Sequence, residues 1–343
     1  MSEPTDDLYR NEEYKGSKEE ETAEFQRHVQ QVLAAQQRLA RKHFAGQPHR
    51  VFHSKSHGCL KGKLNLLEDR PEWTRHGIFA ANGKTSYDVL VRFSNGMGSN
   101  QHDLIPDVRG IGVKIFGISD PSTNPDAPEP RTIDFLMTNS TNGFGRDQEE
   151  FVEFMEANVE PGPLKLKLLG YLLKHRRVAW LLIKASFRIV KSVTTQRYWS
   201  GHAYLLGPDQ AMKFNVRPHQ QPAIERPSKL NRNYLSIDLL SRARRGPIKF
   251  VFCVQRENQD PKLTPIENGL VEWKESDSPS TPVAHLVLDQ QDDSSDCDDL
   301  SFTPGHRIAA HRPLGNIGRG RIFTYEASQK GRSASSEETP VTG

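Results

Sequence analysis

The sequence has few of the features that mark several large classes of protein. Of its 343 residues only three are cysteine, Cys59, Cys253 and Cys297, and their odd number and wide spacing predict neither a disulfide framework nor a zinc site. We therefore expect a reducing compartment and a cytoplasmic location. The net charge of +3 is too small to favour nucleic acid as a partner.

Long apolar runs are also missing. No stretch approaches the ~20 residues that a membrane span needs. The first seven residues, M-S-E-P-T-D-D, are acidic and contain no apolar stretch, so they do not look like a secretory signal. The chain contains neither a P-loop nor a G-x-G-x-x-G turn after a strand pattern. The composition is otherwise that of a globular protein with a sizeable core.

What the sequence does contain predicts a single domain between two flexible ends. Residues 1–21 are polar and acidic and predict a flexible arm, and residues 333–343 predict a disordered tail. The intervening residues 22–332 show no clean internal boundary, so we interpret them as one domain.

Within that domain, helix patterns and strand patterns alternate. Apolar residues at helical spacing predict helices over 22–44, 147–157 and 164–190. Short β-prone runs separated by turn residues predict an antiparallel sheet or barrel. These runs lie at 87–93, 111–116, 133–137, 203–206, 249–254 and 283–288.

Arg321 and Tyr325 are four residues apart, which is one helical turn, so on a helix their side chains share a face. A tyrosine phenol has an ordinary pKa near ~10 and is a poor metal ligand while protonated. A guanidinium on the adjacent turn stabilises the phenolate, and phenolate oxygen is a hard ligand suited to ferric iron. The pair is common on helices and predicts little alone. Taken singly, His53 is likewise typical of a structural histidine.

Several short motifs, in a particular order and spacing, include His53, Arg321 and Tyr325. Together the motifs resemble the haem-binding core of the catalase family, over roughly residues 50–332. They are R-V-F-H-S-K at 50–55, V-R-F-S at 91–94 with D-V-R-G-I-G-V-K-I-F at 107–116, I-D-F-L-M-T-N-S-T-N-G-F-G-R-D at 133–147, L-S-F-T-P at 300–304 and G-R-I-F-T-Y at 320–325.

This resemblance implies both a fold and an activity. The fold would be α+β, an antiparallel β-barrel catalase-like core with surrounding helices and no C-terminal flavodoxin-like domain. The protein would be a haem-dependent peroxidase that binds haem b (iron protoporphyrin IX). It would reduce hydrogen peroxide or organic and lipid hydroperoxides through a ferryl intermediate, and a second peroxide or an organic electron donor would complete the cycle. We expect a homo-oligomer, the commonest state of soluble assemblies, and no nicotinamide cofactor.

The resemblance also implies roles for the matched residues. Tyr325 would be the axial ligand of the iron, as tyrosine is in catalases. His53 would move a proton between the two peroxide oxygens, Asn139 would polarise the peroxide, and Ser94 would orient the His53 ring. The residues expected to bind the cofactor are Arg50, Arg92 and Arg332 at the propionates, Arg321 beside the tyrosine, and Phe144, Phe151 and His202 near the porphyrin.

Departures from the family pattern bear on the substrate. Gly96 stands three residues after the Phe of R-F-S, where most members have a branched apolar residue. This difference predicts wider access to the iron and favours organic or fatty-acid hydroperoxides beside hydrogen peroxide. A rearranging enzyme of the allene oxide synthase kind is an alternative, although such enzymes usually have Thr where this chain has Phe52. A non-catalytic haem carrier is a third possibility, which the retained His53 and Asn139 oppose.

Two further patterns leave alternatives open. Leucines interleave with Lys and Arg along 164–190, which is typical of a surface helix packed on the barrel or of a basic, apolar helix that contacts an anionic membrane or a lipid. His49, His53 and His57 are spaced by four, which on a helix would form a metal-binding face. Their segment, however, is predicted to be loop and strand.

Overall fold

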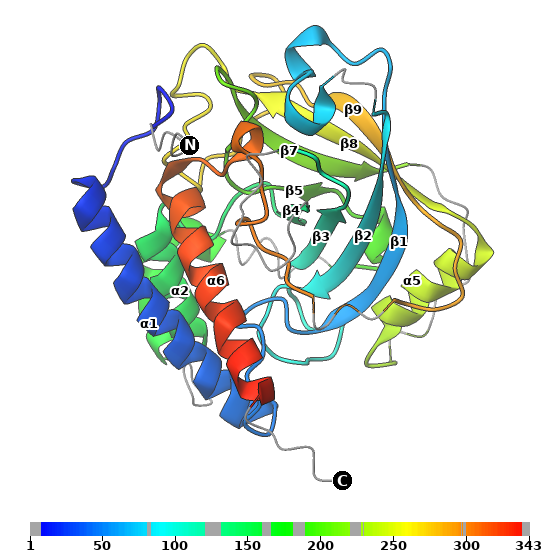
Figure 1. Cartoon of the computed structure of the whole chain (residues 1–343). Coiled ribbons are helices and arrows are strands. Elements are labelled where there is room, and N and C mark those ends of the chain that lie inside the picture. Colours follow the sequence, from blue (N-terminus) through cyan, green and yellow to red (C-terminus); the bar gives the residue numbers. More distant parts are fainter. Residues whose placement is uncertain are drawn as a thin grey trace.

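The structure is a computed structural model that describes residues 8–80, 84–120, 132–159, 166–180, 189–219, 228, 230–295, 297 and 300–337, with side chains of the last helix described as far as residue 332. Its centre is a β-barrel with helices packed outside it (Figure 1). The family resemblance implied this arrangement, and the structure confirms the α+β barrel.

The barrel is an antiparallel sheet that closes on itself. Its strands follow the order β5-β4-β3-β2-β1-β9-β8-β7-β6, and the additional pairing of β5 with β7 closes the ring. The strands are β1 Ser56–Leu66, β2 Ser86–Asn95, β3 Arg109–Ile115, β4 Ile133–Thr138, β5 Tyr198–Trp199, β6 Tyr204–Leu205, β7 Ala211–Pro218, β8 Ile248–Arg256 and β9 Thr281–Leu288. Closure leaves the eight ring strands without a free edge.

The barrel interior is filled by alternate side chains of the strands. One row runs across four neighbouring strands, where Leu60 pairs with Val91, Val91 with Val113 and Val113 with Phe135. All four side chains are at most 1% exposed. Because successive side chains of a strand point to opposite faces, this alternation commits one face of each strand to the core.

Helices surround the barrel on two sides. Helices α1 (Lys18–His43), α2 (Gln148–Val159) and α6 (Gly315–Glu337) contact one another on one side, and α5 (Tyr234–Arg245) lies at the other (Figure 1). Helix α3 (Leu166–Lys174) packs on α2, and residues 176–180 are also helical. Short 3₁₀ turns occupy Glu72–Thr74, Gly77–Phe79, Val193–Thr195 and Ala309–His311.

The helix predicted over 22–44 is confirmed and begins four residues earlier, at Lys18. Ser17 caps it: its hydroxyl accepts from the backbone N of Glu20, whose side chain accepts from the backbone N of Ser17. The helix predicted over 147–157 is also confirmed. The helix predicted over 164–190 is broken at His175, and residues 160–165 and 181–188 lie outside the described part of the chain.

The flexible arm predicted over 1–21 is wrong for residues 8–21. The Glu12 carboxylate is buried and accepts from Arg312 and Arg319 at 2.7 Å each and from the backbone N of Gly315 at 2.8 Å. Acidic composition indicated a solvated segment, but these acids are the partners of arginines at the start of α6. Residues 1–7 lie outside the described residues, and α6 continues to Glu337, past the boundary predicted at 332.

The prediction that the cysteines form no disulfide is wrong. Cys59 on β1 and Cys297 are 238 residues apart in sequence, yet their Cα atoms are 6.3 Å apart and the two sulfurs are bonded. Sequence spacing could not show this, because barrel closure brings the two segments together. Cys253 is a buried free thiol. The cytoplasmic location stays a prediction.

In the part of the chain that the structure describes, none of the helices has the combined length and apolar character needed to cross a bilayer.

Candidate functional site

A cavity of about 1670 Å³, counted with its opening to solvent, lies between the barrel and the helices. The barrel contributes the ends of β2, β3 and β4, and the helices contribute α2 and α6. The wall also includes residues 50–53 between α1 and β1, residues 142–144 after β4, residues 200–202 after β5 and residues 301–303 before α6. Segments that are far apart in sequence therefore meet around one space.

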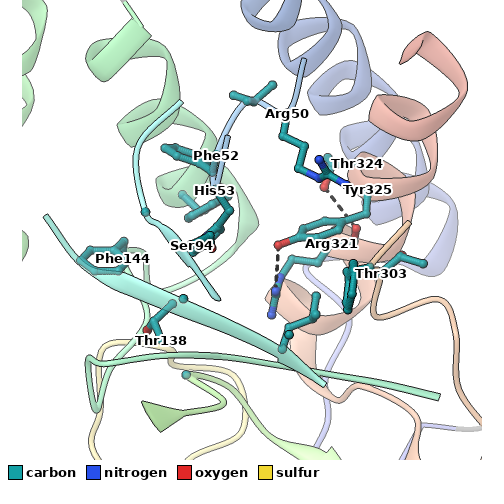
Figure 2. A pocket seen from close by; sticks show the side chains of 18 of the residues that line it. Arg50, Phe52, His53, Ser94, Thr138, Phe144, Thr303, Arg321, Thr324 and Tyr325 are labelled. Atoms are coloured by element: carbon teal, nitrogen blue, oxygen red, sulfur yellow. Dashed lines mark hydrogen bonds between the residues drawn. The ribbon is translucent and has the colours of Figure 1, made fainter. Parts of the chain in front are cut away.

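His53 and Ser94 approach the cavity from one side (Figure 2). The His53 backbone has a φ of +57°, and its N–H donates to the Gly96 carbonyl at 3.0 Å. The ring Nδ1 lies 3.1 Å from the Ser94 hydroxyl oxygen, as predicted for an orienting contact. A Cβ at position 110 on β3 would overlap the His53 ring, so glycine at this position makes room for the imidazole.

Burial, and then the positive charge of Arg92, lowers the pKa of His53 to about 4. The imidazole is therefore neutral at neutral pH. In the tautomer that donates from Nδ1 to Ser94, the opposite nitrogen, Nε2, is available as a base. The site thus holds a neutral histidine whose orientation is set by a hydroxyl.

Tyr325 and Arg321 approach from α6 (Figure 2). Arg321 donates from Nη2 to the Tyr325 hydroxyl oxygen at 3.0 Å, so the predicted contact across one helical turn is present. Its Nη1 lies 2.8 Å from Nδ1 of His202. Burial, and then the charge of Arg321, holds the pKa of His202 well below its usual range. Neutral His202 can therefore accept from Arg321 and fix the guanidinium against the tyrosine.

Four arginines line the cavity: Arg50, Arg92, Arg321 and Arg332. No aspartate or glutamate is among the described residues that line it. Burial, and then the charge of the nearby Arg50, lowers the pKa of Arg332 to about 10. The wall is therefore suited to a ligand that carries carboxylates.

Aromatic side chains form the apolar part of the wall. Phe144 and Phe151, both predicted, line the cavity together with Phe52 and Phe154. The rings of Phe52 and Phe154 stack with centroids 6.3 Å apart, and those of Phe144 and Phe154 with centroids 5.8 Å apart. Sequence reasoning missed Phe154, although its position three residues after Phe151 on a predicted helix is the signal that would have found it.

The structure does not place Asn139 among the residues that line the cavity, and its role at the peroxide stays a prediction. Its side-chain oxygen accepts from the backbone N of Arg109 at 2.7 Å, which ties it to β3, and it does not line the cavity. Asn142 lines the cavity instead, with its amide donating to the Leu270 carbonyl at 2.5 Å. Asn139 continues the β3–β4 ladder, because its backbone N–H also donates to the Arg109 carbonyl, at 2.9 Å. The second asparagine of the same motif was the available signal.

The prediction that Gly96 widens the access to the cavity is wrong. A Cβ at position 96 would overlap the side chain of Val108, which also lines the cavity. The space left by the missing side chain is therefore filled from the neighbouring segment. Comparing residue types at position 96 alone could not reveal that Val108 occupies this volume.

His49, His53 and His57 do not form a common face. His53 faces the cavity, and the ring of His49 stacks on Phe44. His57, which lies on β1, is buried near Asp103. Among the described residues, no group of three or more His, Cys, Asp or Glu side chains could hold a metal ion. The alternative of a histidine metal face therefore has no support in this arrangement.

The geometry agrees with comparisons to known proteins. A model of the catalase family matches residues 15–158. Residues 15–158 are thus similar to the catalase family, and the fold of the whole chain is that of solved catalases. No curated protein sequence matches the chain.

Solved catalases share the fold of this chain. A fungal catalase superposes with a TM-score of 0.67 at 16% identity, over 83% of this chain and 59% of its own. Catalase A from Saccharomyces cerevisiae gives 0.68 at 16% identity, over 87% and 64%. A bacterial catalase gives 0.68 at 17% identity, over 99% and 66%. The chain thus spans about three fifths to two thirds of the length of these catalases.

The residues that line the cavity fit a haem. Haem iron needs an axial ligand, and the two haem carboxylates need cations. Tyr325 supplies an oxygen ligand whose hydroxyl already accepts a hydrogen bond from a guanidinium. The cavity wall combines four arginines with an apolar, aromatic surface and lacks acidic side chains among its described residues. The residues present therefore match the chemistry of the cofactor.

Proposed function

We propose that the protein is a haem-dependent peroxidase that reduces hydrogen peroxide or organic and lipid hydroperoxides. The observation that carries the proposal is the placement of His53 with Ser94 and of Tyr325 with Arg321 on one cavity. When bound, haem would supply the iron that takes an oxygen atom from a peroxide and is reduced again by a donor. Tyr325 would hold the iron, and Arg50, Arg92 and Arg332 would hold the haem carboxylates.

His53 does the acid–base work in this proposal. Its Nε2 takes the proton from one oxygen of the peroxide and returns it to the other, which leaves as water or as an alcohol. The pKa of about 4 keeps the imidazole neutral, so it can accept that proton at neutral pH. Ser94 holds the ring so that Nε2, not Nδ1, faces the cavity.

Arg321 and the aromatic wall prepare the site for this step. Arg321 donates a hydrogen bond to the Tyr325 oxygen, and His202 holds the guanidinium in place. The apolar side chains of Phe52, Phe144 and Phe154 exclude water from the side that His53 occupies.

The test is to reconstitute the purified chain with haem and record its Soret band before and after adding hydrogen peroxide or a fatty-acid hydroperoxide. We expect a spectral change and oxidation of an organic donor. Oxygen release would indicate catalase activity, and an epoxide product would indicate a rearranging enzyme. A haem-loaded protein whose spectrum does not respond to any peroxide would be a carrier, and the proposal would fail.

Two variants separate binding from chemistry. Tyr325→Phe should lose haem or bind it weakly, whereas Tyr14→Phe, whose ring lies against Arg319 outside the cavity, should bind it normally. His53→Ala should retain haem but react with peroxide ~10²–10⁴-fold more slowly. His43→Ala, at the exposed end of α1, is the matched control.

A further inference from the structure

The outer face of α3 is apolar and exposed. Leu166, Leu169 and Leu173 follow a spacing of three and four residues, so they share one side of the helix. They are 67%, 54% and 72% exposed, and Trp180 in the next helical segment is 58% exposed. Such a patch of large apolar side chains on a water-facing helix marks an interaction surface.

The opposite face of α3 already anchors the helix. Tyr171 is buried and its hydroxyl donates to the Glu150 carbonyl on α2 at 3.3 Å. Leu168 and Leu172 pack on a cluster that contains Phe154 and Phe144, two residues of the cavity wall. The outer leucines are therefore not needed to hold the helix, and only one apolar layer separates them from the cavity.

The charged residues within 166–180 have one sign. Residues 166–180 contain Lys167, Lys174, Arg176 and Arg177 and no Asp or Glu. All four basic side chains are exposed, and Lys174 also pairs with Glu153 at 3.1 Å. A helix with exposed leucines and a tryptophan beside Lys and Arg has the chemistry of a segment that lies in the headgroup region of an anionic bilayer.

We propose that residues 166–180 dock the protein on an anionic lipid surface, with the outer leucines and Trp180 inserted between headgroups. This surface then lies next to the aromatic side of the cavity. Where it concerns the substrate, the inference rests on the proposed function, and it specifies lipid hydroperoxides that are still within a membrane. Docking itself requires no turnover and can be tested without it.

The first test is co-sedimentation of the haem-loaded chain with vesicles of phosphatidylcholine, alone or with 30% phosphatidylglycerol as a chosen composition. We expect binding to the anionic vesicles only. The double variant Leu169→Ser/Leu173→Ser should bind on the order of tenfold more weakly, because it removes the inserted apolar area. Leu230→Ser is the matched control, since Leu230 is 88% exposed and lies near α5, away from α3; it should bind like the parent chain.

The second test concerns charge. Arg176→Gln/Arg177→Gln should weaken binding to anionic vesicles by about fivefold per arginine, and added salt should weaken binding of the parent chain. Equal binding to neutral vesicles would overturn the electrostatic part of the inference. No binding to either vesicle would overturn the docking surface altogether.

Oligomeric state and turnover separate this inference from its rivals. If sedimentation shows that Leu169→Ser/Leu173→Ser converts an oligomer to a monomer, a second copy covers the leucines and lipid docking is wrong. If docking occurs, the same variant should consume a phospholipid hydroperoxide in vesicles more slowly than the parent chain, but hydrogen peroxide at the same rate. Vesicle binding without any peroxide reaction would leave docking established and remove the proposed function.

Discussion

At the scale of single residues, the properties of His53 come from its neighbours. Ser94 sets its ring orientation, burial and then the charge of Arg92 lower its pKa, and the absence of a side chain at Gly110 gives the ring its space. None of these neighbours is adjacent to it in sequence. They reach it because β2 and β3 pair so that Ser94 lies opposite Gly110.

Gly110→Ala should displace the His53 ring without altering the side of the cavity that carries Tyr325. The added Cβ would overlap the imidazole and also lie 2.9 Å from the Ser94 hydroxyl oxygen. We expect haem binding to persist and the rate of reaction with peroxide to fall by about tenfold or more, measured by stopped-flow spectroscopy. Gly170→Ala, where nothing lies within 4 Å, is the control and should react normally. An unchanged rate in Gly110→Ala would show that ring position does not matter.

The pH profile should report the lowered pKa of His53. The neutral imidazole is the active form, so the rate falls as acid protonates it, with a midpoint near the pKa of about 4. Carboxylates bound beside Arg92 would offset that charge and raise the midpoint, but burial, the larger cause, keeps it below the ordinary ~6.5. The measurement is the peroxide rate against pH over a range in which the Soret band is stable. A midpoint at or above 6.5 would contradict the buried, neutral histidine.

At the scale of elements, the segment that precedes α6 connects the disulfide to the cavity. Cys297 is bonded to Cys59 on β1, and the Leu300 carbonyl three residues later accepts from Arg50 at 2.7 Å. Ser301 and Thr303 then line the cavity. The disulfide therefore anchors a short stretch of cavity wall to the barrel.

Replacing both Cys59 and Cys297 by Ser should lower the free energy of unfolding by about 2–5 kcal/mol, because the bond closes a long loop in the unfolded chain. It should also weaken haem binding by loosening the partner of Arg50. Thermal unfolding and haem titration measure the two effects. A reducing agent should shift the melting temperature of the parent chain but not of the double variant. Equal shifts in both would mean that the effect comes from elsewhere.

At the scale of the whole molecule, the two ends of the described chain are joined. Glu12 and Glu21 hold Arg319 near the start of α6, the helix that carries Tyr325. Buried carboxylates that pair with arginines are costly to disrupt, because the remaining charge then lacks its partner. The N-terminal segment is thus part of the support of the site.

Glu12→Ala should therefore destabilise the protein by about 3–5 kcal/mol and weaken haem retention. Glu13→Ala is the matched control. It removes the same charge at the next residue, but the Glu13 side chain is exposed. Thermal unfolding and the rate of haem loss to an acceptor protein measure the outcome. If the two variants behave alike, the buried cluster does not support α6.

Much of the architecture and most of the site could be predicted from the amino-acid sequence. Alternation and helical spacing located six of the strands and the helices at 18–43 and 148–159, because these patterns are local. The motifs placed His53, Ser94, the four arginines and Tyr325, all of which the structure brings to one cavity. Strands β1, β5 and β7 and helix α5 were not predicted, since their burial depends on neighbours that are distant in sequence.

Four other features depend on tertiary contacts and were not predicted from the sequence. In the structure Asn142 lines the cavity and Asn139 does not, and Val108 occupies the space beside Gly96. Cys59 is bonded to Cys297, and the segment around Glu12 is held by hydrogen bonds. The physical reason is common to all four. Each depends on which atoms fill a given volume once the barrel closes, and spacing along the chain does not contain that information.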